Sequence, residues 1–73
     1  MTIGQNIRAA RESAGLTQRK LGEGADVDSS YISRLENDEI PNPGIQLVAR
    51  IAEVTGVTID SLLGSTPPAA ANV

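Results

Sequence analysis

Seventy-three residues are enough for one domain. The chain contains no cysteine and no histidine, which excludes disulfides, thiolate metal sites and the commonest general base. Six Lys and Arg residues face nine Asp and Glu residues, and the resulting net charge of −3 opposes strong non-specific attraction to nucleic acid.

The apolar runs are short, none approaching the roughly 20 residues that span a bilayer, and no signal peptide is visible. We therefore expect a cytoplasmic protein without a membrane partner. Helical spacing of apolar residues predicts an all-α domain over residues 1–64. Residues 65–73 lack charge and periodicity, and we expect a flexible tail there or the start of a linker to a further domain.

The first predicted helix begins at a capping box, in which Thr2 and Gln5 satisfy each other's backbone N–H groups. Gly15 is expected to end this helix, and Leu16 to pack inward across the break. The inward stripe of the helix is expected to contain Ile3, Ile7, Ala10 and Ala14.

A second helix is predicted over about residues 18–25, with Thr17 as its N-cap. Gly22 lies in the middle of it, where glycine costs roughly 1 kcal/mol against alanine, and this indicates close approach by another backbone. Val27 occupies the corner that follows. Asp28 is placed to cap a third helix, from about residue 29 to residue 37.

The third predicted helix has one apolar and one polar side. Ile32 and Leu35 lie three residues apart on the inward side. The other side carries small hydroxyls and one forked donor, a set suited to the base edges in a major groove. These residues are Ser29, Ser30, Ser33 and Arg34.

The stretch from residue 18 to residue 37 resembles the helix-turn-helix of the lambdoid repressor and Cro family of transcription regulators (XRE type). Its apolar positions fall at that family's spacing, and the run YISRLEN at residues 31–37 is close to the sequence that the family usually has there. The resemblance covers residues 3–64 and implies a compact five-helix DNA-binding domain with helices 2 and 3 as its helix-turn-helix. Asp26 departs from the pattern, because it stands where the family usually has glycine.

The resemblance implies that the polar residues of the third helix meet DNA bases. Arg34 can donate two hydrogen bonds to guanine O6 and N7, and the alternatives are a phosphate contact or simple exposure. Ser29 and Ser30 stand at the helix entrance, where they could instead bond phosphates or support the cap. Ser33 completes the predicted base-contacting set.

The resemblance also implies four phosphate contacts, from Gln18, Arg19, Tyr31 and Asn37. Gln18 and Arg19 lie in a first helical turn, whose unpaired N–H groups attract anions; the alternative is a solvated polar turn. Tyr31, the only aromatic residue, either reaches a phosphate or packs near Leu35. Asn37 matches a phosphate-contacting position of the family.

Arg11 and Glu36 lie at the margins of apolar stripes. The resemblance implies a partly buried salt bridge between them, which would tie the first helix to the end of the recognition helix. The alternative is two unrelated surface charges, each worth little. A salt bridge would remove Arg11 from the cations available to DNA.

After a loop over residues 38–42, Asn42 and Pro43 are expected to open a fourth helix that ends at Gly56. Thr58 is expected to cap a short fifth helix that ends at Gly64. The inward residues of the fourth helix are predicted to be Ile45, Val48, Ile51 and Ala52, and those of the last segment Val57, Leu62 and Leu63. The family often dimerises through this end, so the resemblance implies a homodimer whose expected contact residues are Ile40, Leu47 and Ile59.

We therefore predict a sequence-specific regulator of transcription, most simply a repressor, that binds a pseudo-palindromic operator in double-stranded DNA as a dimer. The alternative is a protein-interaction module of the same fold, antitoxin-like or part of a larger regulatory complex. Enzymatic activity, a metal, a cofactor and a small-molecule ligand are not expected, because the sequence has no nucleophile–base pair, metal cluster or phosphate-binding glycine loop. The expected location is the cytoplasm, in association with the nucleoid.

Overall fold

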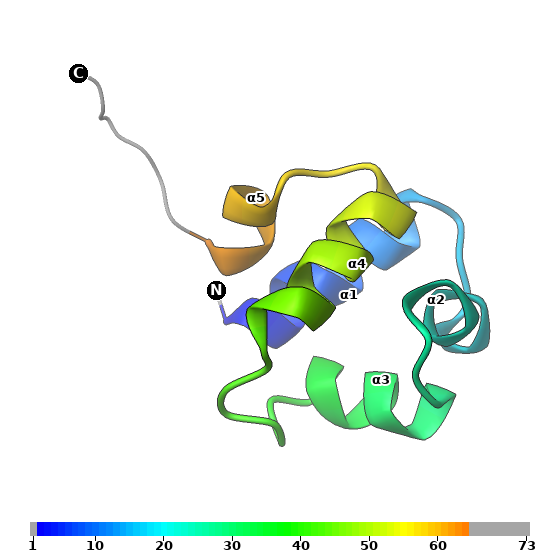
Figure 1. The fold of residues 1–73 in the computed structure, drawn as a ribbon, viewed down its shortest axis with the longest axis horizontal. Helices are drawn as coiled ribbons and strands as arrows, with labels where there is room; N and C mark the ends of the chain where they lie inside the picture. The colour runs from blue at the N-terminus through cyan, green and yellow to red at the C-terminus, as the bar shows by residue number, and fades with distance from the viewer. Residues whose placement is uncertain (1, 65–73) are drawn as a thin grey trace.

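The computed structural model describes residues 2–64, which form five α-helices and no strand (Figure 1). The helices are α1 (Ile3–Ser13), α2 (Gln18–Ala25), α3 (Ser29–Glu36), α4 (Ile45–Thr55) and α5 (Ile59–Leu63). The predicted all-α, five-helix fold is thereby confirmed. The predicted tail, residues 65–73, lies outside the described residues.

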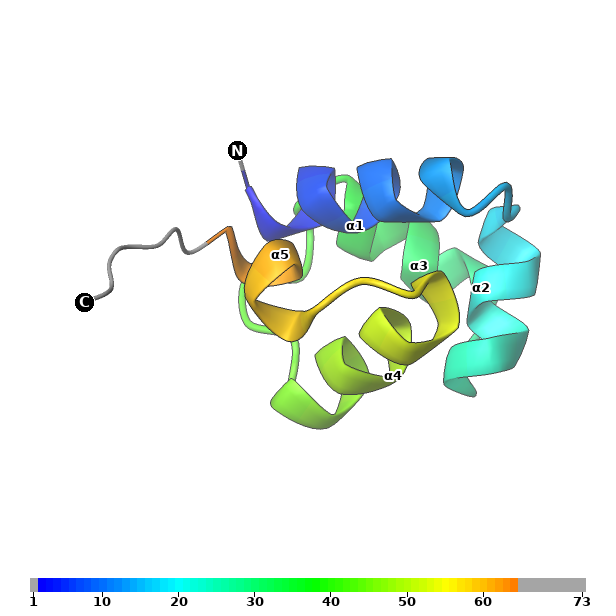
Figure 2. The same cartoon turned by 90° about the horizontal axis from the view of Figure 1, so that it is seen from above.

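The helices enclose one core and leave α3 at an edge of the molecule. Helix α2 packs against α3 and α4, and α1 packs against α3, α4 and α5. Seen from above, α1 and α4 run along opposite sides, with α2 at one end and α5 at the other (Figure 2). Helix α3 lies along the lower edge in Figure 1, and no other described helix covers its outer side.

The core draws on every helix, and each of its fully buried large side chains contributes about 1.5–3 kcal/mol by leaving water. At two glycines of α2, another segment of the chain comes so close that a side chain would not fit. A Cβ on Gly22 would lie 2.6 Å from the Val27 carbonyl oxygen, and one on Gly24 would lie 2.8 Å from Val54 Cγ2. The close backbone approach predicted at Gly22 is confirmed. The buried apolar residues are Ile7, Ala10, Leu21, Ala25, Ile32, Leu35, Val48, Ile51, Ala52 and Leu62.

The start of α1 is the predicted capping box. The Gln5 backbone N–H donates to Thr2 Oγ1 at 3.1 Å, and the Thr2 backbone N–H donates to Gln5 Oε1 at 3.0 Å. The helix ends before Gly15, which has a φ of +72°. Ala14 was expected in the inward stripe, but it is exposed, because it is the C-cap and lies beyond the last helical turn.

The start of α3 differs from the prediction. Asp28 occupies the N-cap position, but its side chain makes no capping hydrogen bond. Its backbone carbonyl accepts from the N–H groups of Tyr31 and Ile32 instead, at 3.0 and 3.2 Å. The Asp28 residue is exposed, so water can solvate its carboxylate in place of the capping hydrogen bond.

Helix α4 begins two residues later than predicted. Gly44, and not Asn42, is the N-cap, with φ −65° and ψ 149°, and Pro43 lies outside the helix. Glycine is an acceptable N-cap, and a start at Ile45 still leaves Val48 and Ile51 on the buried side. Ile45 was expected to face inward, but this first helical residue is 60% exposed.

Helix α5 has its predicted limits. The Ser61 backbone N–H donates to Thr58 Oγ1 at 3.1 Å, and Gly64 ends the helix with a φ of +74°. Leu62 is buried as predicted. Leu63 was expected to close the core, but it is 46% exposed, because it follows the buried Leu62 by one residue and so lies about 100° around the helix from it.

Candidate nucleic-acid interface

Helix α3 is divided lengthwise into a buried and an exposed side. Ile32 and Leu35 are fully buried, and they fix the rotation of the helix about its own axis. That rotation leaves Ser29, Ser30 and Arg34 exposed. Three of the four residues predicted to meet bases therefore lie on the open side of the helix. The fourth, Ser33, is half buried.

The corner between α2 and α3 is a tight turn with a defined backbone conformation. Asp26 adopts the left-handed conformation, with φ 63° and ψ 43°, at the position where glycine was expected from the family pattern. The Val27 backbone N–H donates to the Gly22 carbonyl at 2.9 Å. The backbone of residues 27–29 passes so close to Gly22 that no Cβ fits there. The absence of a side chain at residue 22 thus lets the corner turn sharply.

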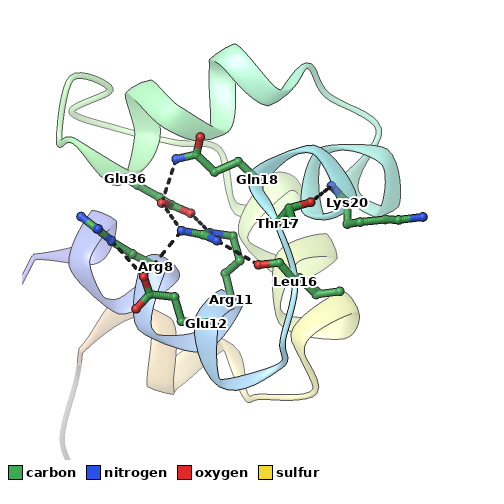
Figure 3. A network of polar contacts seen from close by, with 8 residues as sticks. All are labelled: Arg8, Arg11, Glu12, Leu16, Thr17, Gln18, Lys20 and Glu36. Atoms are coloured by element: carbon green, nitrogen blue, oxygen red, sulfur yellow. Dashed lines mark hydrogen bonds and ion pairs between the residues drawn. The ribbon is translucent and has the colours of Figure 1, made fainter.

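An ion pair joins the C-terminal end of α3 to α1 (Figure 3). Arg11 Nε donates to Glu36 Oε2 at 2.6 Å, and Arg11 Nη2 donates to Glu36 Oε1 at 3.2 Å. The two side chains are only 12% and 2% exposed. Arg11 Nη1 also donates to the Leu16 carbonyl at 2.9 Å. The pair implied by the resemblance is therefore present, and Arg11 is engaged on all three guanidinium nitrogens.

Burial and pairing act in opposite directions on the Arg11 guanidinium. Its hydrogen bond with Glu36 raises the pKa of Arg11 above the ordinary value, desolvation lowers it, and the charges of Glu36 and Glu12 raise it further. The net shift of the pKa is upward, so Arg11 keeps its positive charge throughout the physiological pH range. An ion pair with so little access to water has a structural role, and its hydrogen bonds occupy the Arg11 guanidinium.

Gln18 is the third member of this network, which its sequence position did not reveal. Its Nε2 donates to Glu36 Oε1 at 3.1 Å, so the side chain predicted to bind phosphate also holds the C-terminal end of α3 (Figure 3). The carboxamide has two N–H donors, and the network uses one of them. Gln18 is half buried in the first turn of α2.

The other predicted phosphate contacts lie around this centre. Arg19 is exposed on α2, and its Nε lies 3.5 Å from Glu23 Oε2. Tyr31 is half buried on α3, and Asn37 is exposed at the C-cap of that helix. No described contact joins any of these three side chains to the Arg11 network, so their predicted phosphate roles remain predictions.

The surface cations of the described chain are mostly paired with carboxylates. Arg8 pairs with Glu12, Arg19 and Lys20 pair with Glu23, and Arg34 pairs with Glu39, at N–O distances from 3.4 to 4.0 Å. Side chains in these pairs are 55–84% exposed, so each pair is worth about 0–1 kcal/mol and can open toward another anion. Each of these cations therefore has a carboxylate close by that offsets part of its charge.

The acidic loop after α3 has a structural role that the sequence did not indicate. Asp38 has a φ of 62°, and its Oδ2 accepts a hydrogen bond from Thr2 Oγ1 at 2.9 Å. The carboxylate therefore lies at the N-terminus of α1, where a negative charge is favourable. Asp38 lies against Thr2 and Gly4, which come more than 30 residues earlier. A single sequence contains no pattern that would predict so distant a contact.

The three residues expected to form a dimer contact, Ile40, Leu47 and Ile59, are half buried and pack against the core. The large apolar side chains that are exposed among residues 2–64 are instead Ile45 and Leu63. Burial against the protein's own core leaves the first three with less surface for a partner, and their dimer role remains a prediction.

The described chain offers no other chemical centre. Among residues 2–64 no group of three His, Cys, Asp or Glu side chains is arranged to hold a metal ion. None of the described helices is both long and apolar enough to cross a membrane. An open hollow of about 360 Å³ beside the corner is lined by Gly22, Glu23, Asp26, Val27 and Asp28, and its acidic character disfavours anions.

Comparison with known proteins places these features in a family context. The family model described as helix-turn-helix matches residues 7–62. The immunity repressor protein of Bacillus phage phi105 is 34% identical over 64 residues, which cover 88% of this chain and 44% of that protein. The transcriptional regulator SinR of Bacillus subtilis is 36% identical over 61 residues, covering 84% of this chain and 55% of SinR. The chain thus spans about half the length of these curated relatives.

Solved structures of related proteins superimpose closely. SinR in complex with DNA has a TM-score of 0.80 at 35% identity, covering 85% of this chain and 98% of that chain. SinR in complex with SinI has the same TM-score and identity, covering 60% of that chain. The P22 c2 repressor, solved with a synthetic operator, has a TM-score of 0.79 at 27% identity, covering 86% of this chain and 94% of that chain.

Proposed function

The chain belongs to the helix-turn-helix family, and on that premise we propose that it is a transcriptional repressor that binds double-stranded DNA in a sequence-specific manner. The repressors among its relatives support this, as does the similarity to SinR and the P22 c2 repressor, both of which have been solved with DNA. The proposal includes no enzymatic activity and places the protein at the nucleoid.

One observation carries the proposal: the polar side of α3 is exposed, whereas its apolar side is fully buried. Arg34 is exposed one helical turn after Ser30, and Ile32 and Leu35 hold that side outward. An α-helix fits the major groove of B-DNA, where a guanidinium can donate to guanine O6 and N7 and a hydroxyl can bond to any base. In this arrangement Ser29, Ser30, Ser33 and Arg34 meet bases.

The phosphate contacts follow from the same orientation. Gln18 and Arg19 lie in the first turn of α2, whose backbone N–H groups attract a phosphate. Tyr31 and Asn37 extend the contact along α3. Two copies related by two-fold symmetry would place their α3 helices in successive major grooves, with half-sites about 34 Å apart and a pseudo-palindromic operator.

Selection from a library of random DNA duplexes with the purified protein tests the proposal. We expect a preferred sequence with two inverted half-sites, and we expect Arg34→Ala to weaken binding to it by about 1–3 kcal/mol and to relax the preference at one base pair. Arg50→Ala is a matched control, because Arg50 is an exposed arginine on α4 and not on α3. If Arg34→Ala and Arg50→Ala had equal effects, α3 would not be the recognition surface.

A second candidate is a protein-interaction module of the same fold. The net charge of −3 and the exposed side chains of Ile45 and Leu63 favour it, and SinR, a relative, has been solved in complex with the protein SinI. No preferred duplex in the selection, together with loss of a protein complex in Ile45→Ser, would support this candidate over DNA recognition.

A further inference from the structure

The end of α3 is a tight turn that brings Glu39 back over Arg34. The Glu39 backbone N–H donates to the Arg34 carbonyl at 2.9 Å, and the Asp38 backbone N–H donates to the Leu35 carbonyl at 3.2 Å. This pair of hydrogen bonds, with Asp38 in the left-handed conformation, is a Schellman motif. The motif fixes the backbone of Glu39 relative to that of Arg34, five residues earlier.

The turn is also held from outside α3. Asp38 accepts the hydroxyl hydrogen bond of Thr2 at 2.9 Å. A Cβ on Gly4 would lie 2.5 Å from both Asp38 Oδ1 and the Leu35 carbonyl oxygen, so the turn rests directly on α1. Glu39 therefore projects from a braced turn, although its own side chain is 55% exposed.

The carboxylate of Glu39 lies on one particular edge of the Arg34 guanidinium. Arg34 Nε is 3.6 Å from Glu39 Oε1, which is an ion pair and longer than a hydrogen bond. A guanidinium is a planar fork, and bidentate recognition of guanine needs two of its donors directed together at O6 and N7. A carboxylate on the Nε edge does not occupy the two terminal nitrogens, so both remain available to donate together to one base.

We propose that Glu39 is a positioning residue that makes Arg34 selective for guanine, an inference that rests on the proposed function. The carboxylate limits the orientations of the guanidinium and discourages Arg34 from turning to a phosphate. As a negative charge it also weakens binding to every duplex, because it repels phosphates. Glu39 thus lowers affinity in general and raises discrimination between sequences.

Glu23 provides the contrast within the same molecule. It pairs with Arg19 and Lys20 on α2, and its side chain is 57% exposed, so its charge and exposure resemble those of Glu39. Its partners are not on the helix that meets bases. Removal of the Glu23 charge should therefore strengthen binding to all duplexes alike.

The test measures the ratio of affinities for the selected operator and for a scrambled duplex, by fluorescence anisotropy at fixed salt. In Glu39→Ala we expect this ratio to fall by about two- to fivefold, the range that an exposed ion pair allows. Binding to the scrambled duplex becomes tighter. Glu39→Gln, which keeps an acceptor but no charge, recovers part of the ratio. Glu23→Ala raises both affinities and leaves the ratio unchanged.

Two further measurements separate positioning from a general change in the protein. In an Arg34→Ala background, Glu39→Ala should no longer alter the ratio, because the group it positions is absent. Random-duplex selection with Glu39→Ala should lose preference at the same base pair that Arg34→Ala affects. Thermal melting followed by circular dichroism should give similar midpoints for Glu39→Ala and Glu23→Ala.

The outcomes distinguish this inference from the proposed function. An unchanged ratio in Glu39→Ala, or an equal fall in Glu23→Ala, overturns the inference while operator binding by the wild-type protein stands. A wild-type protein with no preferred duplex overturns the proposed function, and the inference with it.

Discussion

Helix α3 contributes one ion pair to the interior of the molecule and one to its surface, and the two pairs share their chemistry but not their surroundings. The side chains of Arg11 and Glu36 are 12% and 2% exposed, whereas those of Arg34 and Glu39 are 59% and 55% exposed. Charges with little access to water must keep each other as partners, while exposed charges can exchange theirs. The same residue types therefore fix the fold on one side of the helix and remain available to a ligand on the other.

The largest expected effect comes from breaking the buried pair. Arg11→Ala leaves the Glu36 carboxylate without its main partner in a site that water barely reaches. We expect the free energy of unfolding, measured in urea, to fall by about 3–5 kcal/mol. The matched control is Arg34→Ala, which removes an exposed guanidinium and should change that free energy by no more than about 0.5 kcal/mol. Equal losses would contradict the division of roles between the two pairs.

The next largest effect concerns the contact between Gly4 and the turn after α3, which holds Glu39 in place. Alanine at residue 4 gains about 1 kcal/mol in helix propensity, but its Cβ would meet the Leu35 carbonyl, which is backbone and cannot move aside. We expect Gly4→Ala to lower the free energy of unfolding by about 1–3 kcal/mol. It should also reduce the operator-to-scrambled affinity ratio, because Glu39 depends on the turn that rests on Gly4.

Gly24→Ala is the control for Gly4→Ala. It crowds Val54 Cγ2 between α2 and α4, away from the turn after α3. Some loss of stability with an unchanged affinity ratio is the expected result. An equal loss of discrimination in both glycine variants would assign the effect to general loosening of the domain.

A smaller effect is expected when Glu36 loses its hydrogen bond from Gln18 but keeps its ion pair with Arg11. Gln18→Ala removes one hydrogen bond to Glu36 but leaves Arg11 in place. We expect a loss of about 1 kcal/mol in urea unfolding. Gln46→Ala, at an exposed position of α4, should cost less. If Gln18 also binds a phosphate, its variant will bind all duplexes more weakly without a change in preference.

The smallest effect is the response of stability to salt. At 1 M salt the Debye length is about 3 Å, which screens exposed charges but not buried ones. The small stability difference between wild type and Glu39→Ala should therefore vanish, whereas the deficit of Arg11→Ala should persist. Urea unfolding at low and high salt checks this, and a deficit of Arg11→Ala that also vanished would show that its pair is solvated.

The sequence determined by itself those features that depend on neighbouring residues. The capping box at Thr2, the cap at Thr58 and the glycine stops at Gly15 and Gly64 follow from local backbone chemistry, and all are confirmed. The family resemblance is also confirmed, by the helix-turn-helix match over residues 7–62. Local reasoning failed at the start of α4, where Gly44 and not Asn42 is the N-cap. It also failed at Asp28, which is the N-cap of α3 but makes no capping hydrogen bond with its side chain.

Which distant polar groups meet depends on how the helices pack in three dimensions. Gln18 joins Glu36, Asp38 joins Thr2, and a braced turn brings Glu39 over Arg34. Helix spacing tells which side of a helix is apolar, but not how far each helix is rotated and shifted against the next. Those displacements are set by the packing of the whole core, and polar contacts that depend on a few tenths of an ångström follow from them.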